Sequence, residues 1–181
     1  WRGRLPPAKA SFANSGGIFL GPDYRFDLAR PGAALFGIAP LADESNPMAQ
    51  VVHLQGKILQ VRVVDRGMTV GYGATHRFTR PSRLATVAVG YADGYLRSLG
   101  NAGSGFVGDI RVPLVGRVSM DLVTFDVTDV PEHATRPGGT VELLGDRHGV
   151  DALAGEAGTI GYEILTALGR RYHRRYICAG P

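Results

Sequence analysis

The sequence predicts a mostly β protein, in which a small antiparallel domain with one late helix follows a shorter segment of different character. Three observations predict this. Glycine accounts for 26 of 181 residues, about twice the usual share, and glycines without a period indicate many turns. Apolar and polar residues alternate from about Val51 onward, which is typical of half-buried strands. The longest helical pattern comes late, over 151–172.

The strand patterns differ in how deeply they should be buried. In 57–65, we expect Leu59, Val61 and Val63 to share the apolar face of a half-buried strand. Pro113 restricts its own strand to a sheet edge or a bulge, because proline has no N–H to donate. Further strands are expected in 83–91, 108–130 and 138–146.

The late helix and the first segment complete the expected organisation. Residues 151–172 are expected to be helical, and within them Thr159 is expected as an N-cap and Gly169 as a C-cap. The apolar face between these caps consists of Ile160, Ile164, Leu165 and Leu168. In the first segment, a short helix is expected in 33–38, after a Pro-Gly break. The polar stretch 41–50 has the composition of a linker.

Composition narrows the function classes. The formal net charge is only +4, which is weak support for a polyanionic partner. Four Arg and two Tyr gather in 169–176, a pattern found in nucleic-acid binding and, more often, in solvated surfaces. No apolar run reaches the ~18 residues of a membrane span. Five histidines show no metal-ligand spacing, so we expect no metal and no membrane.

Two further expectations, on the cell compartment and on a missing N-terminal portion, come from residues near the ends of the sequence. A single cysteine, Cys178, excludes a disulfide framework and fits a reducing compartment such as the cytoplasm. The sequence opens at Trp1 without a methionine or a signal peptide. We therefore expect an N-terminal portion to be absent, so that targeting cannot be read from these residues.

Two tyrosines lie behind glycines in turn-like stretches. Tyr72 in 70–76 is either a rim aromatic on a strand-end turn or a phenol left uncrowded to reach a ligand. As a base near pH 7 it would need a cationic neighbour, because a phenol has a pKa near 10. Tyr91 precedes an Asp-Gly turn in 90–101, which is either structural or part of a site.

Three other short stretches are also either structural turns or parts of a site. Ser119, Met120 and Asp121 lie between two expected strands, where an aspartate is either a turn residue or a site residue. The small-residue loops 13–17 and 29–34 would hold a phosphate through Ser15 and backbone N–H groups if they follow neighbouring barrel strands.

Taken together and in order, these stretches resemble a known family. "VGYGATH", "VAVGYADGYLRSLGN" and "VGRVSMD" resemble the C-terminal half of bacterial alanine racemase. "FANSGG" followed by "RPGAALFG" resembles the end of that family's barrel domain. The resemblance implies a cytoplasmic homodimeric pyridoxal-phosphate enzyme that makes D-alanine for the cell wall. Residues 1–48 would be the incomplete end of its α/β barrel, and 49–181 its C-terminal β domain.

The resemblance also implies roles for residues of the second domain. Tyr72 matches the catalytic tyrosine, which is the base on one face of the bound amino acid. Tyr91 matches a tyrosine at the substrate entrance. Met120 matches the residue whose backbone N–H receives the substrate carboxylate, and Asp121 lies beside it. In the family, Tyr72, Tyr91 and Met120 would serve the active site of the other subunit.

In the first segment, the resemblance implies a cofactor site for pyridoxal 5'-phosphate. Asn14 and Ser15 match residues that line this site, with Ser15 at the phosphate. Arg30 matches the arginine that faces the pyridine nitrogen. Gly32 and Ala33 match the backbone donors to the phosphate.

The sequence departs from the family at several positions. Neither Lys9 nor Lys57 lies in the motif that carries the cofactor lysine, and the arginine expected to bind the substrate carboxylate from the barrel is also missing. Arg170 stands about where some members have a phosphate-contacting tyrosine, with Tyr172 two residues on. We expect these 181 residues alone neither to bind the cofactor covalently nor to racemise alanine.

Two other functions compete with this interpretation. The basic, aromatic stretch 169–176 would suit a non-enzymatic β-barrel module that binds nucleic acid or a protein. A related decarboxylase family shares the barrel-plus-β architecture, but it places a cysteine in its active site, whereas Cys178 lies far from the matching motifs.

Overall fold

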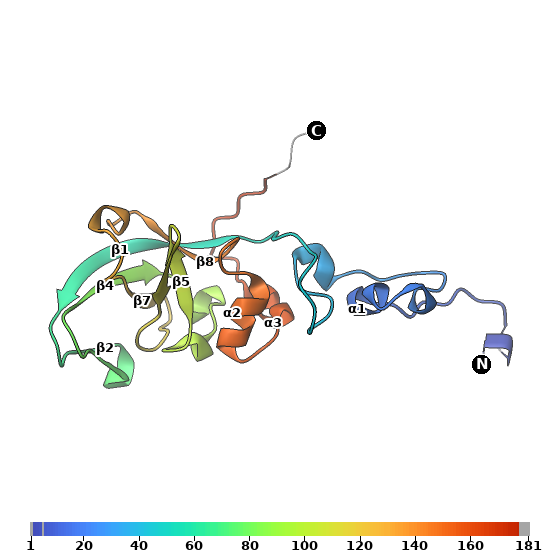
Figure 1. Cartoon of the computed structure of the whole chain (residues 1–181), viewed down its shortest axis with the longest axis horizontal. Coiled ribbons are helices and arrows are strands. Elements are labelled where there is room, and N and C mark those ends of the chain that lie inside the picture. The colour runs from blue at the N-terminus through green and yellow to red at the C-terminus, as the bar shows by residue number, and fades with distance from the viewer. Residues whose placement is uncertain (1, 5, 178–181) are drawn as a thin grey trace. The chain divides into compact units, whose positions relative to one another are not determined.

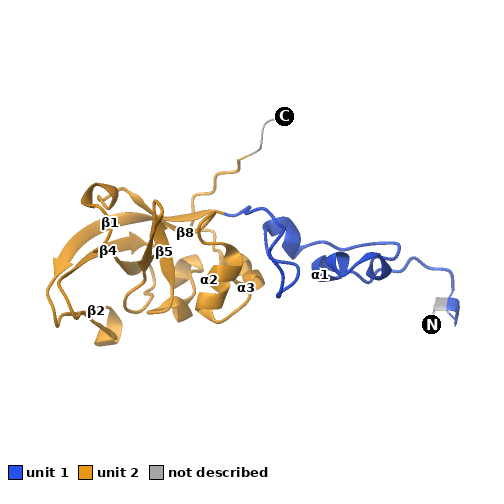
Figure 2. Cartoon of the chain, viewed as in Figure 1, with its two compact units in different colours: residues 1–52 blue, residues 53–181 orange. Residues whose placement is uncertain are grey.

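The computed structural model describes residues 2–4 and 6–177. The chain forms two compact units, residues 1–52 and residues 53–181 (Figure 2). Unit 1 covers the stretch expected as a separate segment, and unit 2 covers nearly all of the expected β domain. Cys178, which bears on the decarboxylase alternative, lies outside the described residues. None of the helices described is long and apolar enough to cross a membrane.

Unit 2 is built on a six-stranded sheet whose neighbouring strands pair antiparallel (Figure 1). The strand order is β6-β5-β8-β1-β4-β7, and a separate hairpin pairs β2 with β3. The predicted mostly β fold class is therefore confirmed. The strands are β1 (Leu54–Val64), β2 (Thr69–Val70), β3 (His76–Arg77), β4 (Ser82–Ala88), β5 (Ser104–Val107), β6 (Ile110–Pro113), β7 (Leu122–Asp126) and β8 (Thr140–Leu144).

The two edges of this sheet meet, which gives unit 2 its barrel-like form. Pro113 ends the edge strand β6, as the sequence predicts. Directly after it, Leu114 forms a bridge with Phe125 of the opposite edge strand β7. The N–H of Val115 then donates to the carbonyl of Thr124 at 2.9 Å. The chain leaving β6 thus continues the hydrogen bonding onto β7.

Two groups of buried side chains hold unit 2 together. The inner face of the sheet packs with the buried faces of the late helices, and a second cluster lies beneath the β2–β3 hairpin. The first group includes the fully buried Tyr95, Phe125, Ile58, Leu143 and Leu153. The second consists of Val64, Val70, Phe78, Leu84 and Val115.

The expected buried face of β1 is wrong in its second half. The register against β4 shifts between Ile58 and Gln60, which marks a bulge. A bulge adds one residue to a strand and so changes which side chains face the core. Leu59 lies within the bulge and is 53 % exposed. Beyond it, Val61 and Val63 pair with Ala85 and Arg83, where Val61 is only partly buried and Val63 is 72 % exposed.

The single late helix expected from the sequence is two short helices, α2 (Val150–Ala157) and α3 (Gly161–Ala167). Gly158 ends α2 with a φ of +70°, a left-handed conformation that stops an α-helix and that glycine adopts readily. The N-cap of α3 is Ile160 and not the expected Thr159. The two helices lie side by side in unit 2 (Figure 1).

Unit 1 consists of short helical turns and connecting segments. The short helix expected in 33–38 is present as the 3-10 helix η3 (Ala33–Phe36). Ser11 and Leu28 form an isolated parallel bridge, so two extended segments run side by side here. The other turns are η1 (Arg2–Arg4), α1 (Ser15–Phe19) and η2 (Pro22–Tyr24).

A partly buried carboxylate ties α2 to the sheet of unit 2. Glu156 accepts the N–H of Ser104 at 2.8 Å, its hydroxyl at 2.6 Å, and a guanidinium N–H of Arg111 at 2.9 Å. Nε2 of the buried His148 lies 3.3 Å from the same carboxylate but lacks hydrogen-bond alignment. Burial opposes ionisation, but the bonds from Ser104 and Arg111 outweigh it and lower the pKa of Glu156.

Replacing Glu156 by glutamine should therefore cost stability at neutral pH and little in acid. A carboxyl whose pKa is lowered on folding contributes stability above its unfolded pKa of about 4.3, and loses it as the pH falls through the folded value. We expect Glu156→Gln to lower the free energy of unfolding by about 2 kcal/mol at pH 7. The gap to the parent protein should shrink at pH 3.5 in urea titrations.

The matched control is Asp65→Asn, which changes an exposed carboxylate of unit 2. This variant should track the parent protein at both pH values. A Glu156→Gln difference that stays constant with pH would show that the charge of this carboxylate does not contribute.

Candidate functional site

Tyr72 lies at the tip of the β2–β3 hairpin, in the short 3-10 helix η4 (Tyr72–Ala74). Its side chain is 73 % exposed, so the phenol stands clear of the hairpin and is not packed on it. Gly71 has a φ of +76°, and a Cβ there would lie 3.1 Å from the backbone nitrogen of Arg117. Only glycine combines this conformation with such a close approach without strain.

Asn101 holds the hairpin tip against the rest of unit 2. Its Nδ2 donates to the hydroxyl of Thr75 at 3.1 Å, and its Oδ1 accepts the N–H of Gly116 at 2.6 Å. The Asn101 N–H donates in turn to the carbonyl of Gly116 at 3.0 Å. Its φ of +58° is one that asparagine tolerates better than most residues. Asn101 was not among the site residues predicted from the sequence.

Tyr91 and Met120 are brought together through their backbones. The N–H groups of Tyr91 and Ala92 donate to the carbonyls of Ser119 and Met120, each at 3.0 Å. A Cβ on Gly90 would lie 2.2 Å from the Met120 oxygen, so only glycine permits this contact. Tyr91 and Met120 are 44 % and 54 % exposed, and both side chains are thus available to a ligand or another surface.

The turn that carries Met120 leaves one backbone donor unused. Ser119 closes the turn, because its N–H donates to the carbonyl of Leu122 at 3.0 Å and its Oγ accepts the Leu122 N–H at 3.1 Å. The N–H of Met120 has no hydrogen-bond partner among the residues that the structure describes. An exposed, unengaged N–H can donate to an anionic ligand group.

Arg171 joins two acidic residues of this region. Its Nε lies 3.2 Å from Oδ1 of Asp93, and its Nη2 lies 2.7 Å from Oδ1 of Asp121. Oδ2 of Asp93 accepts the N–H of Gly90 at 2.9 Å. The hydrogen bond with Asp121 and the charge of Asp93 raise the pKa of Arg171. In the sequence, Arg171 stood out only as one member of the basic stretch.

In unit 1, Ser15 joins the two small-residue loops. Its buried Oγ accepts the N–H groups of Gly32 and Ala34 at 3.0 and 3.2 Å. Asn14 accepts the N–H of Gly17 at 2.9 Å and so caps α1. The expected juxtaposition of these loops is therefore observed.

The remaining unit 1 candidates lie on the same loops. Arg30 donates to the hydroxyl of Ser11 and, at 3.5 Å, to the carbonyl of Phe12. Within the described residues, the N–H of Ala33 has no hydrogen-bond partner, and a Cβ on Gly32 would meet open space. A buried hydroxyl, an unengaged N–H and open space at a glycine fit the phosphate group of a cofactor.

The candidate residues thus form two partial sites in separate units. Asn14, Ser15, Arg30, Gly32 and Ala33 belong to unit 1, whereas Tyr72, Tyr91, Met120 and Asp121 belong to unit 2.

Arg170 and Tyr172, the two positions considered for a phosphate contact near the C-terminus, differ in burial. Arg170 is exposed, whereas the Tyr172 hydroxyl is buried without a partner among the described residues. Burial and the nearby charge of Asp93 raise the pKa of Tyr172.

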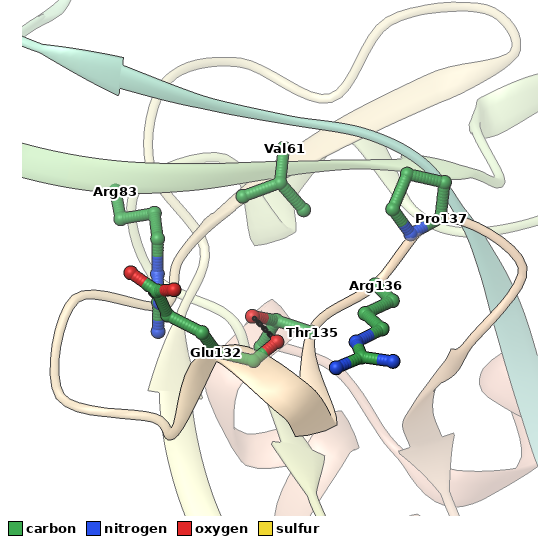
Figure 3. A pocket seen from close by; sticks show the side chains of 6 residues that line it. All are labelled: Val61, Arg83, Glu132, Thr135, Arg136 and Pro137. Carbon is green, nitrogen blue, oxygen red and sulfur yellow. Dashed lines mark hydrogen bonds and ion pairs between the residues drawn. The ribbon is translucent and has the colours of Figure 1, made fainter.

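One pocket of unit 2, of about 320 Å³, contains none of the candidate residues. Arg83 and Arg136 lie on either side of Glu132 in it (Figure 3), and Nη1 of Arg83 is 3.5 Å from the Glu132 carboxylate. The pocket is lined by Val61, Arg83, Glu132, Thr135, Arg136 and Pro137.

The described residues contain no group of three His, Cys, Asp or Glu side chains placed to hold a metal ion.

Comparison with known proteins identifies the family. Residues 51–176 match the family described as "Alanine racemase, C-terminal domain". The chain belongs to the alanine racemase family. An alanine racemase of Rhodospirillum rubrum is 60 % identical over 173 residues, which are 96 % of this chain and 46 % of that protein. The chain thus spans about half the length of the curated alanine racemases it matches.

Solved alanine racemases share the fold of the chain. The Bartonella henselae structure, with covalently bound pyridoxal phosphate, is 44 % identical with a TM-score of 0.92, over 97 % of this chain and 48 % of that one. The Bacillus anthracis structure, with bound L-Ala-P, is 30 % identical with a TM-score of 0.80, over 93 % and 44 % of the two chains. These alanine racemases favour the racemase family over a binding module or a decarboxylase.

Asn101 should be a larger contributor to stability than an exposed turn residue usually is. Asn101→Ala removes both side-chain hydrogen bonds and places alanine at a positive φ, so we expect it to lower the free energy of unfolding by about 2 kcal/mol. Asn101→Gly removes the same bonds, but glycine adopts a positive φ without strain, so this variant should lose less of the free energy of unfolding. Urea titrations of the three proteins measure both effects, and an alanine variant as stable as the parent would contradict the assignment.

Proposed function

We propose that this chain is the C-terminal portion of a pyridoxal-phosphate-dependent alanine racemase, and that it supplies Tyr72 as one of the two bases that move the α-proton of alanine. The reaction would interconvert L- and D-alanine in the bacterial cytoplasm. The observation that carries the proposal is an exposed phenol on a braced, glycine-flanked turn, in a chain that belongs to the alanine racemase family.

Tyr72 would take or return the α-proton at its phenolic oxygen. A phenol has a reference pKa near 10, so proton transfer near neutral pH needs a neighbouring positive charge. Arg117 offers one beside this turn, because a Cβ built on Gly73 would lie 3.4 Å from its Nη1. When bound, pyridoxal phosphate supplies an electron sink that makes the α-proton acidic. The opposite face needs a second base, which in this family is a lysine outside these residues.

The other exposed groups of unit 2 would bind and admit the substrate. The unengaged N–H of Met120 would donate to the carboxylate of alanine, and Tyr91 would shape the entrance to the site. Tyr72, Tyr91 and Met120 are all exposed in unit 2. Their exposure supports a head-to-tail homodimer in which they complete the active site of the other subunit.

The unit 1 loops would hold the cofactor. The hydroxyl of Ser15 and the unengaged N–H of Ala33 would bind its phosphate, with Asn14 ordering the loop as the cap of α1. The N–H of Gly32 donates to Ser15 and would join them only by exchanging this partner for the phosphate. Arg30 would face the pyridine nitrogen, on a guanidinium already fixed by Ser11 and Phe12.

The 181-residue chain alone should not racemise alanine. Neither Lys9 nor Lys57 lies in the family's lysine motif, and Lys57 Nζ already donates to the carbonyl of Gly138 at 3.1 Å. We expect no turnover of L-alanine with added pyridoxal phosphate in a coupled D-alanine assay. Turnover above the background of the free cofactor would overturn this prediction.

Joining this chain to a barrel domain should restore the activity and test Tyr72. In a chimera, the 181 residues replace the matching region of the Rhodospirillum rubrum racemase, to which they are 60 % identical. We expect this chimera to racemise alanine and Tyr72→Phe to lower kcat by about 10²–10⁴-fold, the usual contribution of an acid–base residue. Chiral chromatography of the alanine product measures both rates.

Deuterium exchange distinguishes a lost base from a lost fold. In heavy water, Tyr72→Phe should still exchange the α-hydrogen of one alanine enantiomer, because the base on the other face remains. The control Tyr176→Phe changes a tyrosine that is 83 % exposed and should keep the activity of the parent chimera. Exchange lost equally for both enantiomers would contradict the role of Tyr72 as a base on one face.

A further inference from the structure

Three segments that are distant in the chain meet around the side chain of Arg171. The first is the turn 90–93, whose Asp93 is almost fully buried. The second is the turn around Met120, which receives the hydrogen bonds of Tyr91 and Ala92. The third is the segment after α3, where the N–H of Gly169 donates to the carbonyl of Asp93 at 2.9 Å.

Arg171 is the side chain that links these segments by charge. Its Nε reaches Asp93 at 3.2 Å and its Nη2 reaches Asp121 at 2.7 Å. Asp93 in turn holds the N–H of Gly90 at 2.9 Å. One guanidinium thus fixes both ends of the backbone contact between the two turns.

The two carboxylates create an electrostatic problem for an anionic ligand. Asp121 is the residue after Met120, whose unengaged N–H lies on the same turn. An unpaired carboxylate at this position would repel the carboxylate of an amino acid that approached the N–H. Arg171 offsets one of these two negative charges, and its 2.7 Å contact with Asp121 screens the acid that is next to the N–H, so the N–H remains usable by an anion.

We propose that Arg171 is the positioning residue of the substrate-carboxylate site: it orients the Met120 turn against the 90–93 turn and screens Asp121 from the substrate. This role rests on the proposed function of Met120. Asp121 then acts through Arg171 and does not touch alanine. Arginine suits the role better than lysine, because its planar fork satisfies two carboxylates in fixed directions at once.

Amide hydrogen exchange on the 181-residue chain tests the positioning without reference to activity. The reporters are the amides of Tyr91 and Ala92, whose hydrogen bonds join the two turns. We expect Arg171→Met to speed their exchange by about tenfold and to leave the amides of the central strand β4 unchanged. Arg171→Lys, which keeps the charge but not the fork, should lie between the parent and Arg171→Met.

The matched control is Arg80→Met. It removes another exposed Arg–Asp pair, in which Nη2 of Arg80 lies 2.9 Å from Asp129. It should leave the Tyr91 and Ala92 amides protected as in the parent. Unchanged exchange in Arg171→Met, or a loss spread equally over β4, would overturn the positioning role.

Kinetics in the chimeric racemase test the screening. Arg171→Met should raise the KM for alanine by about tenfold with kcat within about twofold. Adding Asp121→Asn should bring KM back toward the parent value, because it removes the unpaired charge. A lowered kcat with unchanged KM, or no rescue by Asp121→Asn, would overturn the screening. If the parent chimera were inactive, the proposed function would fail while the exchange experiment still decided the positioning.

Discussion

The backbone contact between Gly90 and Met120 is the constraint on which the site in unit 2 depends. The backbone segments of Gly90 and Met120 approach so closely that a Cβ on Gly90 would lie 2.2 Å from the Met120 oxygen. Two hydrogen bonds of 3.0 Å, from Tyr91 and Ala92, extend this contact. The contact sets the spacing between the Tyr91 ring and the Met120 N–H by backbone geometry, which is stiffer than any side-chain packing that could replace it.

The segment that closes the sheet also builds the site. Leu114 and Val115 join the two sheet edges. The next residues, Gly116 and Arg117, brace the Tyr72 turn, and the chain then makes the Met120 turn before entering β7. Exposed functional groups are therefore carried on loops that a closed sheet holds rigidly, which is how binding residues on loops acquire a fixed geometry.

Local patterns predicted the features that depend on neighbouring residues. An apolar, β-branched run predicted β4, and a run behind a Gly-Gly turn predicted β8. The missing N–H of Pro113 restricted its strand to an edge or a bulge, and β6 lies at an edge. Period-two alternation failed at Leu59 in β1, because the bulge after Ile58 depends on pairing with β4 and leaves no local mark. The late helix was predicted as one because Gly158 reads as an ordinary glycine until its φ of +70° is known. Asn101 and Arg171 were missed because their partners lie far away in the chain.

The exposure of the candidate groups determines what unit 2 can contribute. Near neutral pH, the phenol of a tyrosine is a poor base on its own. Its surroundings must therefore supply the desolvation and positive charge that make it a useful base, and only some of these come from this unit. Unit 2 provides fixed positions: a braced turn for Tyr72, a backbone donor on Met120 and a guanidinium on Arg171 that pairs with two acids. In the proposed racemase, these positions would be set before any ligand arrives, so that a covering surface would need to supply only the cofactor, the second base and the exclusion of water.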